Sequence, residues 1–347
     1  MLRHDFLRLG ALPLLGAVER KPADANCILL MMVGGPSQLD TFDMKPDAPS
    51  DIRGPFRPIR TNVPGISISE IFPRTARHAD KYSLIRSMHH DGPAVHDAGH
   101  HLMQTGRAFS YDVSHPSVSC VASQFHRVRS VMLPSAIGAT GGNMPHGDGP
   151  GFLGDRFAPA VMDCEQAPER YGRNAFGRSC FQALRLVESG VRFVTVNMFE
   201  TVFDELTWDI HGAKPFTPIS AYRDVVGPMF DMAYSSLLED LSARGLLSNT
   251  MVIAMGEFGR TPRINASGGR DHWTGCYTVL AGGGPLRGGT VIGSSDAIGG
   301  EPKDRPVHPG ELAATIYKGL GIPLGTELRP GLAVVEPGVQ PIGELFA

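Results

Sequence analysis

The sequence has few of the residues that mark several protein classes. Its 5 cysteines show no C-x-x-C spacing, which argues against a zinc ribbon, a redox motif or a disulfide framework. The formal net charge is -3 and no basic run is interleaved with aromatic residues, so bulk electrostatic binding of nucleic acid is not expected. No apolar run approaches the roughly 20 residues of a transmembrane helix. We therefore expect no transmembrane segment, and we expect mostly buried thiols at Cys27, Cys120, Cys164, Cys180 and Cys276.

The composition is that of a soluble globular protein. Apolar residues make up 42% of the 347 residues and charged residues 19%, while 42 glycines and 28 prolines predict much loop. A chain of this length could hold two average domains, but α/β folds of this size are often one unit. Since no repeat or convincing linker interrupts the chain, we expect a single domain over residues 21–347.

The N-terminal segment 1–20 has the pattern of a degenerate export signal. A basic start precedes an apolar stretch from Leu9 to Val18, which is too short to span a bilayer. The run "RHDFL" is similar to a twin-arginine signal in which His4 replaces the second arginine. We expect an exported or periplasmic protein; an ordinary N-terminal helix of a cytoplasmic protein is the alternative.

Apolar runs alternate with helical patterns along the chain. Continuous apolar runs predict strands buried on both faces at 27–33, 82–88, 191–199, 250–256 and 277–283. Helical spacing predicts helices at 177–190, 226–247 and 309–321. This alternation predicts an α/β fold in which a mainly parallel central sheet is sandwiched by helices on both faces. The Gly/Pro-rich stretch 135–169 predicts a long irregular excursion.

Residue types that bind metals gather after the predicted strands. In an open α/β sheet, ligands bind beyond the carboxyl ends of the strands, so these positions are expected to share one rim. Carboxylates and imidazoles together suit zinc, manganese, magnesium or calcium, which the pattern does not distinguish. The residues are Asp40 and Asp43 after the first strand, five histidines at 89–101 after the second, Asp209 and His211 after the third, and Glu257, Asp271 and His272 after the fourth.

Several segments together resemble a known family. They are "FLRLGA", "GGPSQLDTFD", "WDIHG", "GEFGRTPRIN", "GGRDHW", "LAGGG" and "VIGSSD", in order over nearly the whole chain. They resemble the family of domains of unknown function numbered 1501, bacterial proteins abundant in planctomycetes and grouped with the alkaline phosphatase and sulfatase superfamily. The resemblance implies an alkaline phosphatase-like fold with one or two metal ions at the strand ends.

The resemblance also implies roles for particular residues. Metal ligands are expected at Asp40, Asp209, His211, Glu257, Asp271 and His272. Phe258 stands where these enzymes have the histidine of an Asp-His pair, so one usual ligand is missing.

The nucleophile of the superfamily has no counterpart in the sequence. His96 lies where sulfatases carry the cysteine that becomes formylglycine, and histidine cannot undergo that conversion. His96 could instead ligate a metal, act as general base on a metal-bound water, or take up a phosphoryl group itself. The hydroxyls of Ser37, Ser87 and Thr105 are possible nucleophiles by proximity.

Two further features bear on the substrate. Arg260 could clamp an anion bidentately beside a metal, and Arg263 and Arg270 could do so too, although a solvated loop arginine is the alternative. Asn143 and His146 lie in the excursion, which could fold over the site.

These observations predict a metal-dependent hydrolase of a phosphate or sulfate ester in an exported compartment. Its substrate would be an anionic small molecule or a sulfated or phosphorylated glycan. The alternative is a catalytically silent member that keeps the metal and binds a glycan or protein partner; a cytosolic phosphomutase-like enzyme is a third possibility.

Overall fold

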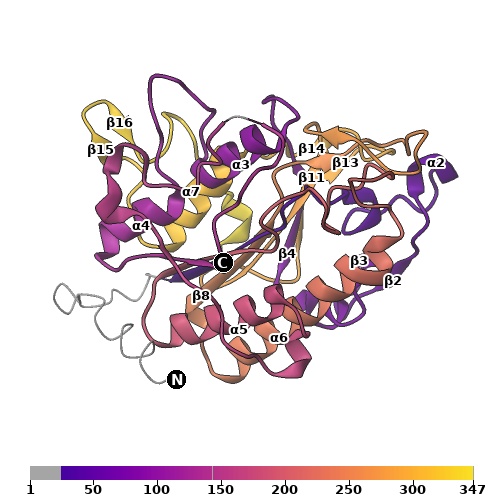
Figure 1. Ribbon diagram of the computed structural model, residues 1–347, viewed down its shortest axis with the longest axis horizontal. Helices are drawn as coiled ribbons and strands as arrows, with labels where there is room; N and C mark the ends of the chain where they lie inside the picture. The colour runs from indigo at the N-terminus through magenta and orange to yellow at the C-terminus, as the bar shows by residue number, and fades with distance from the viewer. Residues whose placement is uncertain (1–24, 143, 347) are drawn as a thin grey trace.

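Eight strands form one twisted sheet at the centre of the protein, which is described by a computed structural model over residues 25–142 and 144–346 (Figure 1). The strands follow the order β12-β4-β11-β8-β1-β7-β5-β6. All neighbours pair in parallel except β11, which runs antiparallel to both β8 and β4. The bounds are β1 Asn26–Met31, β4 Ser83–Met88, β5 Val131–Leu133, β6 Ala160–Val161, β7 Phe193–Asn197, β8 Thr250–Met255, β11 Tyr277–Gly283 and β12 Val291–Ile292.

The predicted strands are confirmed, and they are the buried interior of the sheet. Every residue of β1, β7 and β8 is buried, because each of these strands has neighbours on both sides and helices over both faces. The expected mainly parallel sheet is therefore confirmed, with β11 as the exception. The short strands β5, β6 and β12 were not predicted, because two or three apolar residues give no periodic signal.

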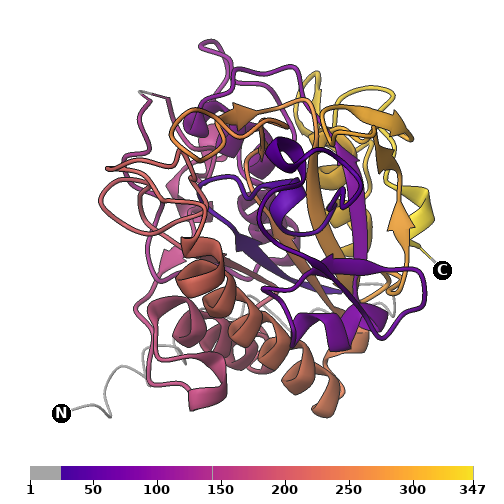
Figure 2. The ribbon, with the colours of Figure 1, turned by 90° about the vertical axis from the view of Figure 1, so that its right-hand side faces the viewer.

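Helices cover both faces of the sheet (Figures 1 and 2). On one face α5 packs on α6, and on the other α3 and α4 pack on α7. The three predicted helices correspond to α5, α6 and α7. The bounds are α2 Ser50–Arg53, α3 His96–Thr105, α4 Val118–His126, α5 Ala175–Glu188, α6 Gly227–Ala243 and α7 Pro309–Gly319.

Small elements decorate the rim of the sheet. Four hairpins are formed by β2 Pro58–Arg60 with β3 Ser67–Ser69, β9 Gly259–Arg260 with β10 His272–Trp273, β13 Ser294–Ser295 with β14 Pro302–Asp304, and β15 Glu327–Arg329 with β16 Leu332–Ala333. A 3-10 turn, η1 Gln38–Asp40, follows β1. Within the part of the chain that the structure describes, no helix is long and apolar enough to cross a membrane. The proposed export signal at 1–20 lies outside the described residues.

An aromatic cluster supports the segment after β7. Trp208 is fully buried and its ring lies 4.8 Å from that of Tyr222. The hydroxyl of Tyr222 donates to the Trp208 carbonyl over 2.7 Å and accepts from the amide of Ser37 over 3.2 Å. Since Ser37 follows β1, these bonds tie the loops after two neighbouring strands together immediately before Asp209.

Two glycines allow the backbone to approach closely at the same rim. A Cβ on Gly34, whose φ is +110°, would lie 2.6 Å from the amide nitrogen of Asp209. A Cβ on Gly99, inside α3, would lie 2.8 Å from the carbonyl oxygen of Glu257. Both positions require glycine because of these contacts, and they bring the segments after β1, β4, β7 and β8 within side-chain reach of each other.

Candidate metal centre

Residues that follow three strands of the sheet converge with a residue of the β9–β10 hairpin at the carboxyl edge of the sheet. Asp209 and His211 follow β7, Glu257 follows β8, His96 begins α3 after β4, and His272 lies on β10. The side chains of Asp209 and Glu257 are completely buried, and that of His96 is 4% exposed. The structure therefore brings together five of the residues expected from the sequence.

Asp209 is the centre of this cluster. Its Oδ1 lies 3.0 Å from His211 Nε2 and 3.2 Å from His272 Nε2, and these two ring nitrogens are 3.0 Å apart. In a tetrahedral zinc site with bonds of 2.0–2.1 Å, neighbouring ligand atoms are about 3.3 Å apart. The three atoms are therefore spaced as ligands of one ion would be.

Hydrogen bonds at Nδ1 fix the ring orientations of His211 and His272. His211 Nδ1 lies 2.9 Å from Asp271 Oδ1, and His272 Nδ1 lies 2.8 Å from the carbonyl oxygen of Ala94. Each Nδ1 must carry a proton to make its bond, which leaves Nε2 of each neutral ring with a lone pair directed at Asp209. Three acceptor atoms thus face one point, an arrangement that a cation stabilises.

Glu257 forms the second half of the cluster. Its Oε1 accepts from the amide of Gly34 over 2.8 Å, and lies 2.6 Å from His96 Nδ1 and 3.5 Å from His100 Nε2. His90 Nε2 donates to the Glu257 carbonyl over 3.2 Å while its Nδ1 accepts from an amide. Glu257 is therefore held by its backbone as well as by its carboxylate.

Burial and charge act in opposite directions on these groups. Burial alone would raise the pKa of both carboxyls, but Arg260 and three histidines hold the pKa of Asp209 well below its usual range, and His100 and His96 lower that of Glu257 to about 2. Burial lowers the pKa of His272, and that of His100 to about 4. Ionised carboxylates and neutral imidazoles are the forms that bind divalent metals.

His96 differs from the other imidazoles because it lies between two carboxylates. Its Nε2 is 3.5 Å from Asp209 Oδ2, on the opposite side of the ring from Glu257. Burial lowers its pKa, but the two neighbouring carboxylates, Asp209 and Glu257, outweigh burial and raise it. Phe258 packs against the rings of His96 and His272, at centroid distances of 5.1 and 4.6 Å.

Buried atoms without hydrogen-bond partners show that the cluster suits a cation. Among the described residues, Asp209 Oδ2, Glu257 Oε2 and both ring nitrogens of His100 have no hydrogen-bond partner and are shielded from solvent. An unsatisfied buried polar group costs about 1–3 kcal/mol, more if charged. Two groups of residues have ligand atoms within 4.8 Å of each other, His96 with Asp209 and His272, and His96 with His100 and Glu257. The donor set of this chain therefore fits the metal that its resemblance implies.

Arg260 is placed differently from a substrate clamp. It is fully buried, and its guanidinium donates to Asp209 Oδ1 over 2.5 Å and to the carbonyls of Gly34, Gly35 and Arg270. These bonds leave the guanidinium facing protein instead of solvent. Arg260 thus fixes Asp209 in the cluster.

The structure does not bring Asp40 to the cluster. The carboxylate of Asp40 accepts from Arg270 Nε over 2.7 Å and from the Ser37 hydroxyl over 2.6 Å, and all three residues are fully buried. Asp40 is therefore satisfied by an ion pair, and Arg270 is occupied by it. The other arginine considered, Arg263, pairs with Asp51 at the surface.

Asp271 contacts the candidate ligand His211 and does not itself face Asp209. Its side chain is 55% exposed and bonds His211 Nδ1 and, over 3.0 Å, Asn265 Nδ2. This is the position of a carboxylate that orients a metal-bound imidazole.

The hydroxyls considered as nucleophiles donate hydrogen bonds to groups outside the cluster. Ser37 donates to Asp40, Ser87 to the carbonyl of Arg305 over 2.6 Å, and Thr105 to the carbonyl of His101 over 2.7 Å. None of these three bonds points at Asp209 or Glu257.

The excursion does fold onto α3, as the sequence suggested for His146. His146 Nε2 lies 3.1 Å from Asp97 Oδ1 and its ring lies 5.6 Å from that of His100. Asn143 lies outside the described residues. His146 therefore borders the cluster through His100 without facing Asp209.

His100 is a residue of this cluster that the sequence analysis counted among the five histidines at 89–101 without giving it a role of its own. His96 and His100 are four residues apart, so on a helix they occupy the same face. This spacing was visible in the sequence, but α3 contains only three apolar residues besides glycine, Ala98, Leu102 and Met103, and the helix was not predicted.

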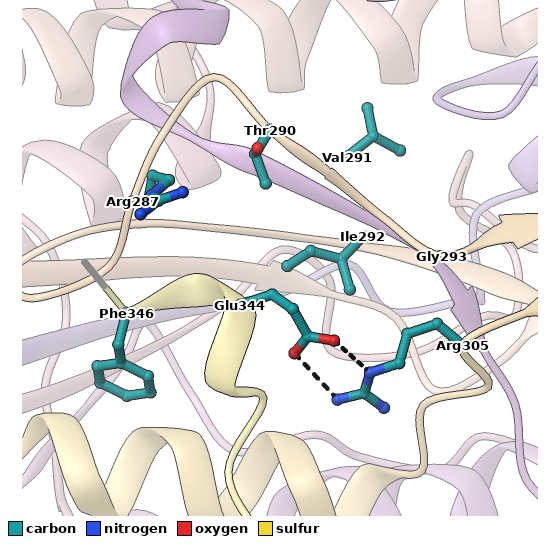
Figure 3. A pocket seen from close by; sticks show the side chains of 8 residues that line it. All are labelled: Arg287, Thr290, Val291, Ile292, Gly293, Arg305, Glu344 and Phe346. Carbon is teal, nitrogen blue, oxygen red and sulfur yellow. Dashed lines mark hydrogen bonds and ion pairs between the residues drawn. The ribbon is translucent and has the colours of Figure 1, made fainter.

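A cavity of about 440 Å³ lies elsewhere, at the β12 edge of the sheet (Figure 3). It is crossed by the ion pair between Arg305 and Glu344, with an Nε to Oε1 distance of 2.6 Å. No residue of the metal cluster lines it, so this cavity is separate from the candidate site.

Several solved structures are similar to this chain at low sequence identity. The C-terminal periplasmic domain of EcEptC from Escherichia coli is similar over 94% of this chain and 91% of its own, with 11% identity and a TM-score of 0.51. A protein of the alkaline phosphatase superfamily from Vibrio parahaemolyticus matches over 86% and 67% (11% identity, TM-score 0.45). PsFucS1 sulfatase from Pseudoalteromonas sp. matches over 86% and 68% (13% identity, TM-score 0.41).

The likeness to the EcEptC domain, at a TM-score of 0.51, shows that the two chains share a fold, and the expected α/β architecture is confirmed. No curated protein matches this chain in sequence. The model of one family, described as protein of unknown function (DUF1501), matches residues 24–168 and 157–333. The chain belongs to this DUF1501 family.

Proposed function

We propose that this protein is a metal-dependent hydrolase of a phosphate or sulfate ester. The observation that carries the proposal is the convergence of Asp209 Oδ1, His211 Nε2 and His272 Nε2, at mutual distances of 3.0 to 3.2 Å. The ester class comes from the resemblance to phosphatases and sulfatases. Export of the protein is part of the proposal and rests on the sequence pattern at 1–20 alone.

Six residues at the site have a defined task in this proposal. Asp209, His211 and His272 would hold a divalent ion, which when bound polarises an ester oxygen and lowers the pKa of water. Asp271 keeps the His211 ring turned toward Asp209, and Arg260 keeps the carboxylate of Asp209 in place. A histidine cannot become the formylglycine nucleophile of sulfatases. We therefore propose that His96 supports the metal site, with a proton on Nε2 directed at Asp209 Oδ2, 3.5 Å away.

Exposure indicates where a substrate would enter. The side chains of His211 and His272 are 22% and 19% exposed, whereas those of Asp209 and Glu257 are 0% exposed. An ester would therefore approach from the histidine side. With Arg260 and Arg270 both buried in internal bonds, the charge of its anionic group would be balanced chiefly by the metal.

The proposal is tested by metal analysis of the purified protein together with a panel of aryl phosphate, aryl sulfate, and sulfated and phosphorylated glycan substrates. We expect at least one bound divalent ion, ester hydrolysis that a chelator abolishes, and recovery on adding the ion back. His211→Ala should lower kcat/KM at least about a hundredfold. His115→Ala is the matched control, because its ring packs on Phe152 outside the cluster and activity should not change.

A catalytically silent, metal-binding member that binds a glycan or protein partner is the second candidate. It is favoured because the three candidate hydroxyls, and the guanidinium groups of Arg260 and Arg270, all make hydrogen bonds within the protein. Bound metal without hydrolysis of any ester in the panel would support this candidate and refute the hydrolase.

A further inference from the structure

We propose that the protein binds a second divalent transition-metal ion, held by His96, His100 and Glu257. This inference deepens the proposed function, because it adds a neighbouring ion to the one at Asp209, His211 and His272. It also gives the histidine at the nucleophile position of the superfamily a role as a metal ligand.

The helix α3 presents both histidines on one face. His96 and His100 are separated by four residues, the spacing at which two imidazoles of one helix can bind a single ion. This face is directed at the segment after β8, because Gly99 lies between them and allows the helix to approach the Glu257 carbonyl closely. Both histidines and Glu257 are buried, so the site is built into the interior of the fold.

The site contains the unpartnered atoms that a metal requires. Both ring nitrogens of His100 and Glu257 Oε2 have no hydrogen-bond partner in residues 25–142 and 144–346 and are shielded from solvent. Glu257 Oε1 accepts from the amide of Gly34 and keeps a second lone pair, so both carboxylate oxygens are available as ligands. Both ring nitrogens of His101 also lack a hydrogen-bond partner among the described residues, but His100 in addition lies 3.5 Å from the buried carboxylate of Glu257, so a bound ion would account for the His100 ring.

Distances and chemistry agree with an ion of the zinc type. His100 Nε2 lies 3.5 Å from Glu257 Oε1, close to the separation of about 3.3 Å between neighbouring ligands in a tetrahedral zinc site. His96 Nδ1 lies 2.6 Å from the same oxygen, which is a hydrogen-bond distance, so on binding the ion would replace the Nδ1 proton and this contact would lengthen. Two imidazoles with one carboxylate favour zinc or a similar transition ion over magnesium or calcium.

His96 links the two ion sites through its two nitrogens. A neutral imidazole has one lone pair and one N–H, so it can ligate one ion only. Nδ1 faces Glu257 and Nε2 faces Asp209 Oδ2. We therefore assign Nδ1 to the second ion and the Nε2 proton to a hydrogen bond with the carboxylate of the first.

The test compares zinc content per chain after equilibrium dialysis of the full-length protein and three variants. We expect two ions in the wild type, one in His100→Leu and one in His211→Leu. His101→Leu is the matched control, because His101 is a buried histidine on the same helix that packs on Phe109, and it should keep two ions. Cobalt substitution gives a second readout, since each site contributes its own visible absorption.

Stability separates a lost ligand from a failed fold. In metal-free protein His100→Leu removes an unpartnered polar group, so its urea midpoint should be equal to or above that of the wild type. With zinc present the order should reverse, because only the wild type gains stability from the second ion.

The outcomes distinguish this inference from the proposed function. If the wild type binds one ion, which His100→Leu keeps and His211→Leu loses, the second site is refuted and the proposed centre stands. If that ion is instead lost in His100→Leu and kept in His211→Leu, the proposed centre is refuted and this site stands. A wild type without bound zinc refutes both.

Discussion

Removal of the Asp271 carboxylate should weaken metal binding without abolishing it. Asp271 does not reach Asp209; it accepts from His211 Nδ1 over 2.9 Å and so fixes which way the ring faces. Loss of such a supporting carboxylate costs 10–100-fold in metal affinity in typical sites. Because the Asp271 side chain is 55% exposed, water can partly replace it, and we expect the lower end for Asp271→Ala, about tenfold or ~1.4 kcal/mol.

The assay is competitive zinc titration against a chromophoric chelator, with Asp271→Asn as a graded variant. Asn keeps an acceptor oxygen for His211 but loses the charge, so its effect should be smaller than that of Ala. Asp224→Asn is the control, because Asp224 pairs with Arg223 at the surface and its loss should not change zinc affinity.

Two results would refute this reasoning. If Asp271→Ala lowers the number of bound ions as His211→Ala does, Asp271 is itself a ligand, as the sequence resemblance implied. If zinc affinity is unchanged in Asp271→Ala while His211→Ala abolishes binding, the ring orientation does not depend on the carboxylate.

Three further predictions concern stability. Arg260→Met leaves a buried carboxylate unpaired and should lower the free energy of unfolding of metal-free protein by about 3–5 kcal/mol, measured with urea; a loss below about 1 kcal/mol would contradict it. Gly34→Ala should cost more than about 1 kcal/mol in the same assay and more than Gly190→Ala, which has a similar positive φ but no atom near its Cβ. The hydrogen bond from Arg305 lowers the pKa of Glu344 below 4.5, so this pair stabilises the fold above pH 4.5 and the contribution is lost as pH falls through the lowered folded-state value. Glu344→Gln should therefore lower stability by less than about 1 kcal/mol at neutral pH and by nothing at the lowest pH; a constant difference would show that its titration is not the cause.

The strands could be predicted because burial on both faces leaves a continuous apolar signal. The predicted runs at 250–256 and 277–283 match β8 Thr250–Met255 and β11 Tyr277–Gly283 within a residue. The antiparallel direction of β11 could not be predicted, since side-chain pattern does not record the direction of pairing. The helix α3 was missed for another reason: it is buried along its whole length, yet most of its residues are polar, among them His96, His100 and His101.

The sequence by itself determined the composition of the rim, since a carboxylate or imidazole directly after a buried strand must lie at the carboxyl edge of the sheet. Glu257, two residues after β8, could be named on that basis, whereas Asp209, His211 and His272 follow their strands at a distance and were supported by the family resemblance as well. Only the tertiary structure decided how charges pair there. Asp40 is satisfied by Arg270, 230 residues away, and Arg260 is folded inward onto Asp209. The sequence does not distinguish a buried arginine that fixes a metal ligand from an exposed arginine that binds a substrate. The distinction comes from desolvation, which depends on every segment packed around the side chain.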